Sequence, residues 1–383
     1  MTYADNAATT RLSDAALSAM MPYLKNSYGN PSSLYSFGQE AHDAVENARG
    51  QMARVLNAQP GEVFFTSCGT ESDNWALRGI AETLGKKGKH IIVSSIEHHA
   101  ILHTAQYLKG QGFRVTYLPV TDKGVVTPEA LENAMEADTI LVSVMLANNE
   151  VGTLQPIREL AEIAHRHGAK FHTDAVQAVG HIPVDVQALG VDLLSLSGHK
   201  FGGPRGVGAL YVKQGTPLAP FILGGGQEKG RRSGTENVAG VAGMAAALTE
   251  AVAKMPGESR RLIALRDRLI AGLLEIPRSR ATGDPINRLP GHASMIFECV
   301  EGESMVLRLD AEGVCCSSGS ACSSASLEPS HVLLAIGLPH EIAHGSLRLT
   351  LGEDTTEQDI DHLLDVIPRV VATLRELSPI WAA

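Results

Sequence analysis

The sequence predicts an α/β fold in which helices cover both faces of a mainly parallel sheet. The first observation is an alternation of short apolar, extended segments with helical segments from about residue 63 to residue 212. The second is that several of these extended segments end directly before polar or glycine-rich residues. Strands that alternate with helices form parallel sheets, and such sheets bind ligands at the carboxyl ends of their strands. The fold class therefore also predicts where a functional site lies.

Two helices open the chain, because apolar residues recur at spacings of three and four over residues 15–24 and 37–56. Turn-forming residues at 29–33 separate them, and Pro31 blocks a continuous helix. The strands expected next are short and apolar: 63–66, 90–94, 114–118, 139–146, 169–173, 191–196 and 207–212. The helices expected between them carry apolar residues at helical spacing: 73–84, 98–109, 128–135 and 157–167.

The rhythm of the chain changes after an Ala-rich helix expected at 238–252. Pro256-Gly257 is the best candidate for a linker, and a long helix at 259–275 follows it. Beyond it we expect strands at 293–298, 305–309 and 346–351. The sequence thus predicts a large domain of residues 15–256. Residues 1–14 and 257–383 are expected to form a smaller α/β domain that closes over the pocket.

Composition excludes several classes of function. The chain has 383 residues and a net charge of −10, without a long basic run, which argues against binding to nucleic acid or an anionic membrane. No stretch approaches the roughly 18 consecutive apolar residues of a membrane span, and the first residues lack the features of a signal peptide. We therefore expect a cytoplasmic protein.

Cysteine usage points to a reactive thiol. The chain has 5 cysteines, an odd number, and no export signal, which argues against a disulfide framework. Three of them, Cys315, Cys316 and Cys322, lie in one short region that lacks the spacing of zinc ligands. We therefore expect no metal site.

Lys200 is the first candidate for catalysis. It ends the motif Ser197-Gly198-His199-Lys200, which directly follows the expected buried strand at 191–196. A desolvated lysine amine loses its proton readily and can form a Schiff base with an aldehyde. The alternative is a surface lysine in a glycine-containing turn, and the motif alone does not decide between the two.

Three further polar residues follow the ends of other expected strands. His98, Asn149 and Asp174 each lie within a few residues of a strand's carboxyl end, as Lys200 does. Taken singly, they could be a core histidine, a turn former and a helix cap. Because the ends of parallel strands meet at one edge, we expect the four residues to form a cofactor pocket.

The residue types in this pocket match the requirements of pyridoxal phosphate. The cofactor needs a lysine for its aldehyde, a carboxylate for its pyridine nitrogen and a cup for its phosphate, and Lys200 and Asp174 supply the first two. The other groups are expected around the phosphate (Gly69, Thr70, Ser197, His199) and around the ring (His98, Gln177, Asn149). A nicotinamide cofactor is disfavoured, because no G-x-G-x-x-G motif joins a strand to a helix.

Two features in the last quarter of the chain indicate how a substrate would be handled. The segment at about 315–327 consists mainly of Ser, Gly and Ala around Cys322, which is typical of a mobile, exposed loop. Cys315 and Cys316 are interpreted as small residues of an adjacent buried strand. Arg348 stands alone in an apolar strand, where an unpaired charge is costly, and a substrate carboxylate would explain it.

The motifs resemble those of the cysteine desulfurases, fold type I pyridoxal phosphate enzymes of the class V aminotransferase group. The resemblance covers nearly the whole chain, and the motifs stand in family order: 5–10, 29–33, 148–150, 174–177, 197–200, 318–322 and 346–348. Segments 65–73 and 227–232 are most similar to the nitrogenase-associated branch. Cys315 and Cys316 depart from the family pattern, which leaves open a disulfide with Cys322 or a sulfur relay.

The resemblance implies a mechanism. L-Cysteine would displace Lys200 from the cofactor, with the substrate carboxylate held by Arg348 and Asn149. Lys200 would then move the Cα proton, and His98 would stack on the ring and assist. Cys322, as thiolate, would attack the substrate sulfur, which leaves a persulfide on Cys322 and releases L-alanine.

The resemblance also implies partners. They are a second copy of the chain, whose Thr235 reaches the neighbouring subunit's cofactor phosphate, and an iron–sulfur scaffold protein that accepts the sulfur. The alternatives are a selenocysteine lyase or another C–S lyase, which would not need the thiol, an aminotransferase, and a non-catalytic scaffold. The sequence leaves open whether the sulfur serves nitrogenase, general cluster assembly or tRNA thiolation, and whether cysteine is preferred over selenocysteine.

Overall fold

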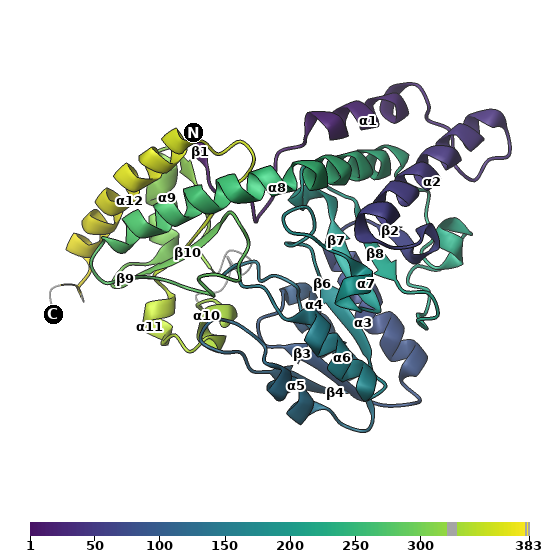
Figure 1. Cartoon of the computed structure of the whole chain (residues 1–383), viewed down its shortest axis with the longest axis horizontal. Helices are drawn as coiled ribbons and strands as arrows, with labels where there is room; N and C mark the ends of the chain where they lie inside the picture. Colours follow the sequence, from purple (N-terminus) through teal and green to yellow (C-terminus); the bar gives the residue numbers. More distant parts are fainter. Residues whose placement is uncertain (320–327, 380, 382–383) are drawn as a thin grey trace.

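The centre of the molecule is a seven-stranded sheet in the order β2-β8-β7-β6-β5-β3-β4 (Figure 1). It is seen in a computed structural model that describes residues 1–319, 328–379 and 381. The strands are β2 (Val63–Thr66), β3 (His90–Ser94), β4 (Arg114–Leu118), β5 (Thr139–Ser143), β6 (Lys170–Asp174), β7 (Leu193–Ser197) and β8 (Gly208–Val212).

The sheet is mainly parallel, as the sequence predicts. Strands β4, β3, β5, β6 and β7 run parallel to one another, whereas β8 is antiparallel to both β7 and β2. Every residue of β3, β5 and β7 is buried, which agrees with their nearly continuous apolar sequences. The carboxyl ends of β3, β5, β6 and β7 therefore lie along one edge of the sheet.

Helices cover both faces of this sheet (Figure 1). On one face α3 (Gly69–Leu84) and α4 (His99–Gly110) pack around Trp75. The helices of the other face share a second core: α1 (Asp14–Lys25), α2 (Ser36–Leu56), α5 (Pro128–Ala134), α6 (Ile157–Arg166), α7 (Val186–Leu189) and the first part of α8 (Val238–Leu274). Short 3-10 helices add turns at η1 (Pro60–Glu62), η2 (Gly198–Lys200) and η3 (Gln227–Gly230).

A second, smaller core lies beside the large sheet. Here β10 (His292–Phe297) pairs antiparallel with β9 (Ser279–Ala281) and with β12 (Ser346–Thr350), and β1 (Thr2–Tyr3) pairs parallel with β11 (Val314–Cys315). The surrounding helices are α9 (Gly302–Ala311), α10 (His331–Ala335), α11 (His340–Ala343) and α12 (Glu357–Leu377). The first strand, β1, and the last helix, α12, both lie in this part (Figure 1). The residue bounds of the two-domain division stay a prediction.

One helix joins the two cores, which corrects the sequence interpretation. The expected linker at Pro256-Gly257 is wrong, because α8 continues through both residues. Proline costs the helix a backbone hydrogen bond. That cost is offset because residues such as Leu248 are buried against the large sheet and residues such as Leu269 in the smaller core. By length and composition α8 could cross a membrane, but half of its most apolar window is buried inside the protein, as in a core helix.

The expected strand at 305–309 is also wrong, since these residues lie in helix α9. Met305 and Leu309 are fully buried, whereas Leu307 between them is exposed. Two buried residues four positions apart share one face of a helix, so the apolar composition of this segment reflects a helical face.

A buried ion pair fixes the glycine-rich loop at 224–235. Arg49 of α2 donates from its two terminal nitrogens to the carboxylate of Glu228 at 2.8 and 2.9 Å, and Glu228 also accepts the Phe65 N–H at 3.0 Å. The Arg49 and Glu228 side chains are only 6% and 3% exposed. Removing one partner of such a pair leaves the other charge buried without compensation.

We expect Glu228→Gln to lower the free energy of unfolding by about 3–5 kcal/mol, measured from urea unfolding followed by circular dichroism. The matched control is Glu162→Gln, whose carboxylate pairs with Arg158 at 3.1 Å on the exposed surface of α6. That change should cost less than about 1 kcal/mol. Equal losses in the two variants would contradict the role assigned to the buried pair.

Candidate active site

Lys200 lies directly beyond the carboxyl end of β7. The strand ends at Ser197, and the 3-10 turn η2 carries the chain to the partly buried Lys200. Its amine donates to the backbone carbonyl of Ala8 at 2.9 Å and to that of Ala7. The N-terminal segment, which belongs to the smaller core, therefore covers the lysine of the larger one.

The structure brings Lys200 together with two of the other predicted residues. His98 precedes α4 beyond the end of β3, and Asp174 is the last residue of β6. Both lie close enough to the lysine to interact with its charge. The shared edge of the sheet brings these three side chains together, although they are far apart in the sequence.

His98 is held as a neutral imidazole. Its Nδ1 accepts the Ala100 N–H at 3.2 Å at the start of α4, so the proton of the neutral ring lies on Nε2. Burial, and then the charge of Lys200, lower the pKa of His98 to about 4. At neutral pH the ring carries no charge that would repel a cationic amine.

The start of helix α3 is shaped for an anion. The helix begins at Gly69, before the expected Asp73, because the Cys68 carbonyl accepts the Ser72 N–H at 3.2 Å. A Cβ on Gly69 would lie 2.6 Å from Val176 Cγ2, so only glycine permits this approach to the end of β6. The amide groups of the first turn and the helix dipole favour negative charge there.

Two hydroxyl groups accompany this helix start. Ser197 Oγ is buried and has no hydrogen-bond partner among the residues that the structure describes. Thr70 is exposed and lines a hollow of about 620 Å³ between α3 and α4, together with His98. Of the predicted phosphate cup, Gly69 and Ser197 lie side by side, since a Cβ on the glycine would be 3.6 Å from the serine Cβ.

Asp174 is a buried carboxyl group within reach of the Lys200 charge. Its Oδ1 accepts the Val176 N–H at 2.8 Å, and burial raises the pKa of Asp174 to about 6 while the Lys200 charge lowers it. A buried carboxylate requires a nearby positive charge to stay ionised at neutral pH.

A layer of polar residues behind Asp174 was not anticipated from the sequence. Burial raises the pKa of Asp73 well above its usual value and that of Glu97 to about 8, and Asp174 adds to both shifts. His172 bonds Ser195 Oγ at 3.0 Å and lies 3.7 Å from Asp73. Because residues two apart on a strand share a face, the position of His172 before Asp174 could have revealed this layer.

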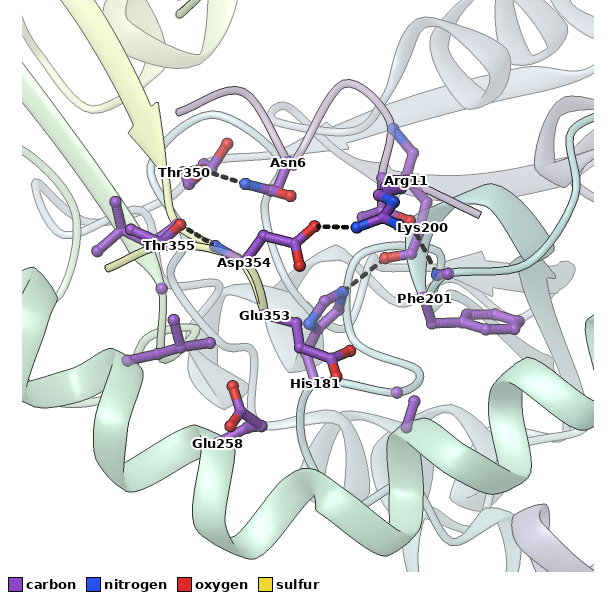
Figure 2. A pocket seen from close by; sticks show the side chains of 18 of the residues that line it. Asn6, Arg11, His181, Lys200, Phe201, Glu258, Thr350, Glu353, Asp354 and Thr355 are labelled. Carbon is purple, nitrogen blue, oxygen red and sulfur yellow. Dashed lines mark hydrogen bonds and ion pairs between the residues drawn. The ribbon is translucent and has the colours of Figure 1, made fainter. Parts of the chain in front are cut away.

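The remaining predicted cofactor residues meet the N-terminal segment. Gln177 Nε2 donates to the Ala7 carbonyl at 3.0 Å, and His199 Nδ1 bonds Thr9 Oγ1 at 3.1 Å. Lys200 and Gln177 line a cavity of about 720 Å³ between this segment and α8, beside Asn6 and other polar residues (Figure 2). Segment 5–10 therefore forms one wall of the site and bonds three of its residues, a role that the sequence motif alone did not indicate.

Arg348 is paired within the chain, which corrects one step of the sequence argument. The premise that its charge lacks a partner is wrong, because Asp5 Oδ1 accepts from Arg348 Nη2 at 3.0 Å. Arg348 Nη1 donates to the Asn149 carbonyl at 3.1 Å, and the arginine is 4% exposed. Its Nε is buried without a partner among the described residues, so this N–H group could donate a hydrogen bond to a substrate.

Two predicted residues are not placed in the pocket. Thr235 is exposed in the loop at 224–235, whose Arg232 donates to Glu71 at 2.7 Å beside the start of α3. Cys322 lies outside the described residues.

Cys315 is half-buried and Cys316 buried next to β1, and burial raises the pKa of Cys316 to about 12.

The donor set fits pyridoxal phosphate. An amine, a buried carboxyl group, a neutral imidazole and a helix start with an unpartnered hydroxyl match the aldehyde, pyridine nitrogen, ring and phosphate of that molecule. The residues that would hold it are Lys200, Asp174, His98, Gly69 and Ser197.

Comparison with known proteins gives consistent results. The family model for class-V aminotransferases matches residues 2–363. The cysteine desulfurase IscS of Methanosarcina thermophila is 54% identical over 99% of this chain and 94% of its own length. The cysteine desulfurase NifS of Azotobacter vinelandii is 46% identical over 99% and 95%, so the comparisons give no preference to the nitrogenase-associated branch.

The fold is similarly close to a solved structure. A NifS-like protein superimposes with a TM-score of 0.92 at 40% identity, over 97% of this chain and 100% of its own. The similarity extends over the large sheet and the smaller core alike, so the whole architecture is shared.

Proposed function

The chain belongs to the class-V aminotransferase family and to its cysteine desulfurases, and on this premise we propose how its residues carry out the reaction. The reaction converts L-cysteine to L-alanine and leaves the sulfur on the enzyme for transfer to an acceptor. The observation that carries the proposal is that Lys200, Asp174 and His98 lie at the carboxyl ends of the parallel strands β7, β6 and β3, along one edge of the sheet.

We propose that pyridoxal phosphate is the cofactor. When bound, it supplies an electron-accepting ring that makes the Cα proton of an attached amino acid removable. Lys200 would bond its aldehyde, and Asp174 would pair with the protonated pyridine nitrogen. Gly69, Thr70 and Ser197 would receive the phosphate at the positive end of α3, with His199 nearby, and Asn149 and Gln177 would border the ring.

Within this site each protein group has a separate task. Lys200, once released by the substrate amine, would move the proton from Cα. His98 would cover the ring as a neutral imidazole, because its pKa of about 4 keeps it uncharged at working pH. Arg348, with Asn149 beside it, would hold the substrate carboxylate.

The sulfur step assigns the nucleophile to Cys322. A bond would form between Cys322 Sγ and the substrate sulfur while the substrate's Cβ–S bond breaks, with the electron pair left on Cβ. Protonation of Cβ then gives L-alanine, and a persulfide stays on Cys322. The sum is one cysteine and one thiol converted to one alanine and one persulfide, so no external reductant enters this half of the cycle.

Arg348→Lys is expected to raise KM for L-cysteine on the order of 30- to 100-fold, because a forked contact with the carboxylate is lost while a positive charge stays beside Asp5. The measurement is the rate of alanine formation against cysteine concentration. The matched control is Arg280→Lys, whose side chain pairs with Glu298 at the edge strand β9 and should leave KM unchanged. An unaltered KM for Arg348→Lys would remove the arginine from the substrate site.

We propose that two chains form a homodimer. Large apolar side chains stay exposed on two neighbouring loops, among them Leu34 at 94% and Leu223 at 82%. Gln227 Nε2 donates to Ser32 Oγ at 3.4 Å, which joins these loops into one surface. A second copy would cover that surface, and the exposed Thr235 would reach the neighbouring subunit's cofactor phosphate.

The sulfur acceptor would be an iron–sulfur scaffold protein, and the enzyme would act in the cytoplasm. A purified chain supplied with pyridoxal phosphate and L-cysteine should form L-alanine and persulfide sulfur in equal amounts, by amino-acid analysis and mass spectrometry. A selenocysteine lyase would instead act on selenocysteine and release little alanine from cysteine. No alanine with either substrate would contradict the proposed function.

A further inference from the structure

Glu150 occupies a fixed position at the edge of the site. It follows β5, its side chain is 6% exposed, and its backbone is held on both sides. The Glu150 N–H donates to Asn148 Oδ1 at 2.8 Å, and its carbonyl accepts from His292 Nε2 at 2.8 Å. The end of the large sheet and strand β10 of the smaller core therefore place this residue between them.

The first contact of the Glu150 carboxyl group is with Ser330. Ser330 Oγ bonds Glu150 Oε2 and also accepts the N–H groups of Val332 at 3.1 Å and Leu333 at 3.3 Å. A hydroxyl group has one proton and two lone pairs. Since the two amides occupy the lone pairs, the Ser330 proton is donated to Glu150.

Gly319 lies next to the same carboxyl group. The Gly319 N–H donates to Ser346 Oγ at 3.0 Å, and a Cβ on this glycine would lie 3.4 Å from Glu150 Oε2. Ser317 just before it exchanges backbone hydrogen bonds with Arg348 at 2.7 and 3.3 Å. The chain thus enters and leaves the segment that carries Cys322 beside one carboxyl oxygen.

The carboxyl group of Glu150 has a pKa close to neutral pH. Burial raises the pKa of Glu150 to about 7, against the opposing effect of Ser330 and of the Arg348 charge. Both its ionised and its neutral form therefore accept from Ser330 near neutral pH. A glutamine keeps an acceptor oxygen of the same shape, whereas an alanine leaves the buried Ser330 hydroxyl without an acceptor.

From these observations we propose that Glu150 is a positioning residue for sulfur transfer, which bonds Ser330 and borders Gly319, the residues on either side of the segment that carries Cys322. The proposal rests on the proposed function, because Cys322 is its nucleophile. Glu150 does not react with the substrate. Its task is to fix the described residues that flank the segment, Gly319 before it and Ser330 after it.

The test separates sulfur transfer from the earlier steps. In Glu150→Ala the rate of Cys322 persulfide formation, followed by quenched mass spectrometry, should fall on the order of ten- to hundred-fold. KM for L-cysteine and the exchange of the L-alanine Cα proton in D2O should stay within threefold, since neither needs Cys322. Glu150→Gln should restore most of the persulfide rate.

A double-mutant cycle locates the effect. Ser330→Ala should slow persulfide formation, and the double variant Glu150→Ala with Ser330→Ala should be no slower than Glu150→Ala alone. Glu62→Ala is the matched control, because Glu62 is also buried and accepts two backbone amides, at 2.9 and 2.7 Å, but lies far from the site. It should leave the persulfide rate unchanged.

Hydrogen exchange tests the proposal independently of catalysis. The amides of 317–319 and 330–333 should exchange at least tenfold faster in Glu150→Ala than in the wild type or Glu150→Gln. Unchanged exchange would overturn the proposal, as would equal losses in persulfide formation and Cα exchange. If the wild type formed no alanine from cysteine, the proposed function would fail, whereas faster exchange would still support the anchoring role.

Discussion

Replacing Lys200 with alanine is expected to lower alanine formation from L-cysteine by on the order of 10³-fold or more. The amine serves twice in the proposed reaction, first to bond the cofactor aldehyde and then to move the Cα proton. Alanine offers no base at this position, and His98 is placed as a neutral ring with its proton on Nε2. The measurement is the rate of alanine formation with saturating cysteine and pyridoxal phosphate.

A second measurement identifies the bond itself. Borohydride reduction of the wild type should fix the cofactor to the peptide that contains Lys200, seen as added mass, and should fix none in Lys200→Ala. Lys254→Ala is the control, because Lys254 lines the same cavity but pairs with Glu353 at the surface. That variant should keep the label and the activity within twofold, and an active Lys200→Ala enzyme would refute the assignment of the lysine.

The sequence was sufficient for the main sheet because its signals are local. Extended apolar segments that alternate with amphipathic helices form a parallel sheet. In a parallel sheet the carboxyl ends of β3, β6 and β7 lie along the same edge. The two errors came from segments whose pattern depends on burial. Pro256 is tolerated in α8 because two cores hold the helix, and Met305 and Leu309 share a helical face that composition alone does not distinguish from a strand.

The location of Lys200 and Asp174 was predictable, because both residues directly follow or end a strand. Their positions follow from the predicted strands alone. The contacts that could not be derived join distant segments: Asp5 pairs with Arg348, and Ala7 accepts from both Gln177 and Lys200. Such pairs depend on how the smaller core closes on the larger one, and no periodicity in the sequence encodes that arrangement.

The exchange of Cα protons offers a way to isolate the role of Cys322, which lies outside the described residues. In Cys322→Ser we expect persulfide formation and alanine release from L-cysteine to fall on the order of 10³-fold, because a serine hydroxyl does not attack sulfur as a thiolate does. Exchange of the L-alanine Cα proton in D2O should stay within threefold of the wild-type rate. In the proposed reaction, substrate binding and deprotonation depend on Arg348 and Lys200, which the change leaves in place.

The neighbouring cysteines provide the matched controls. Burial keeps Cys316 a thiol, since its pKa is raised to about 12, and Cys315 lies in β11 paired with the N-terminal strand. In Cys315→Ser and Cys316→Ser, persulfide should therefore form on Cys322 at close to the wild-type rate. Persulfide that accumulates on Cys315 or Cys316 in Cys322→Ser, with alanine still formed, would move the nucleophile to β11 and make the serine-rich segment dispensable for the first sulfur transfer.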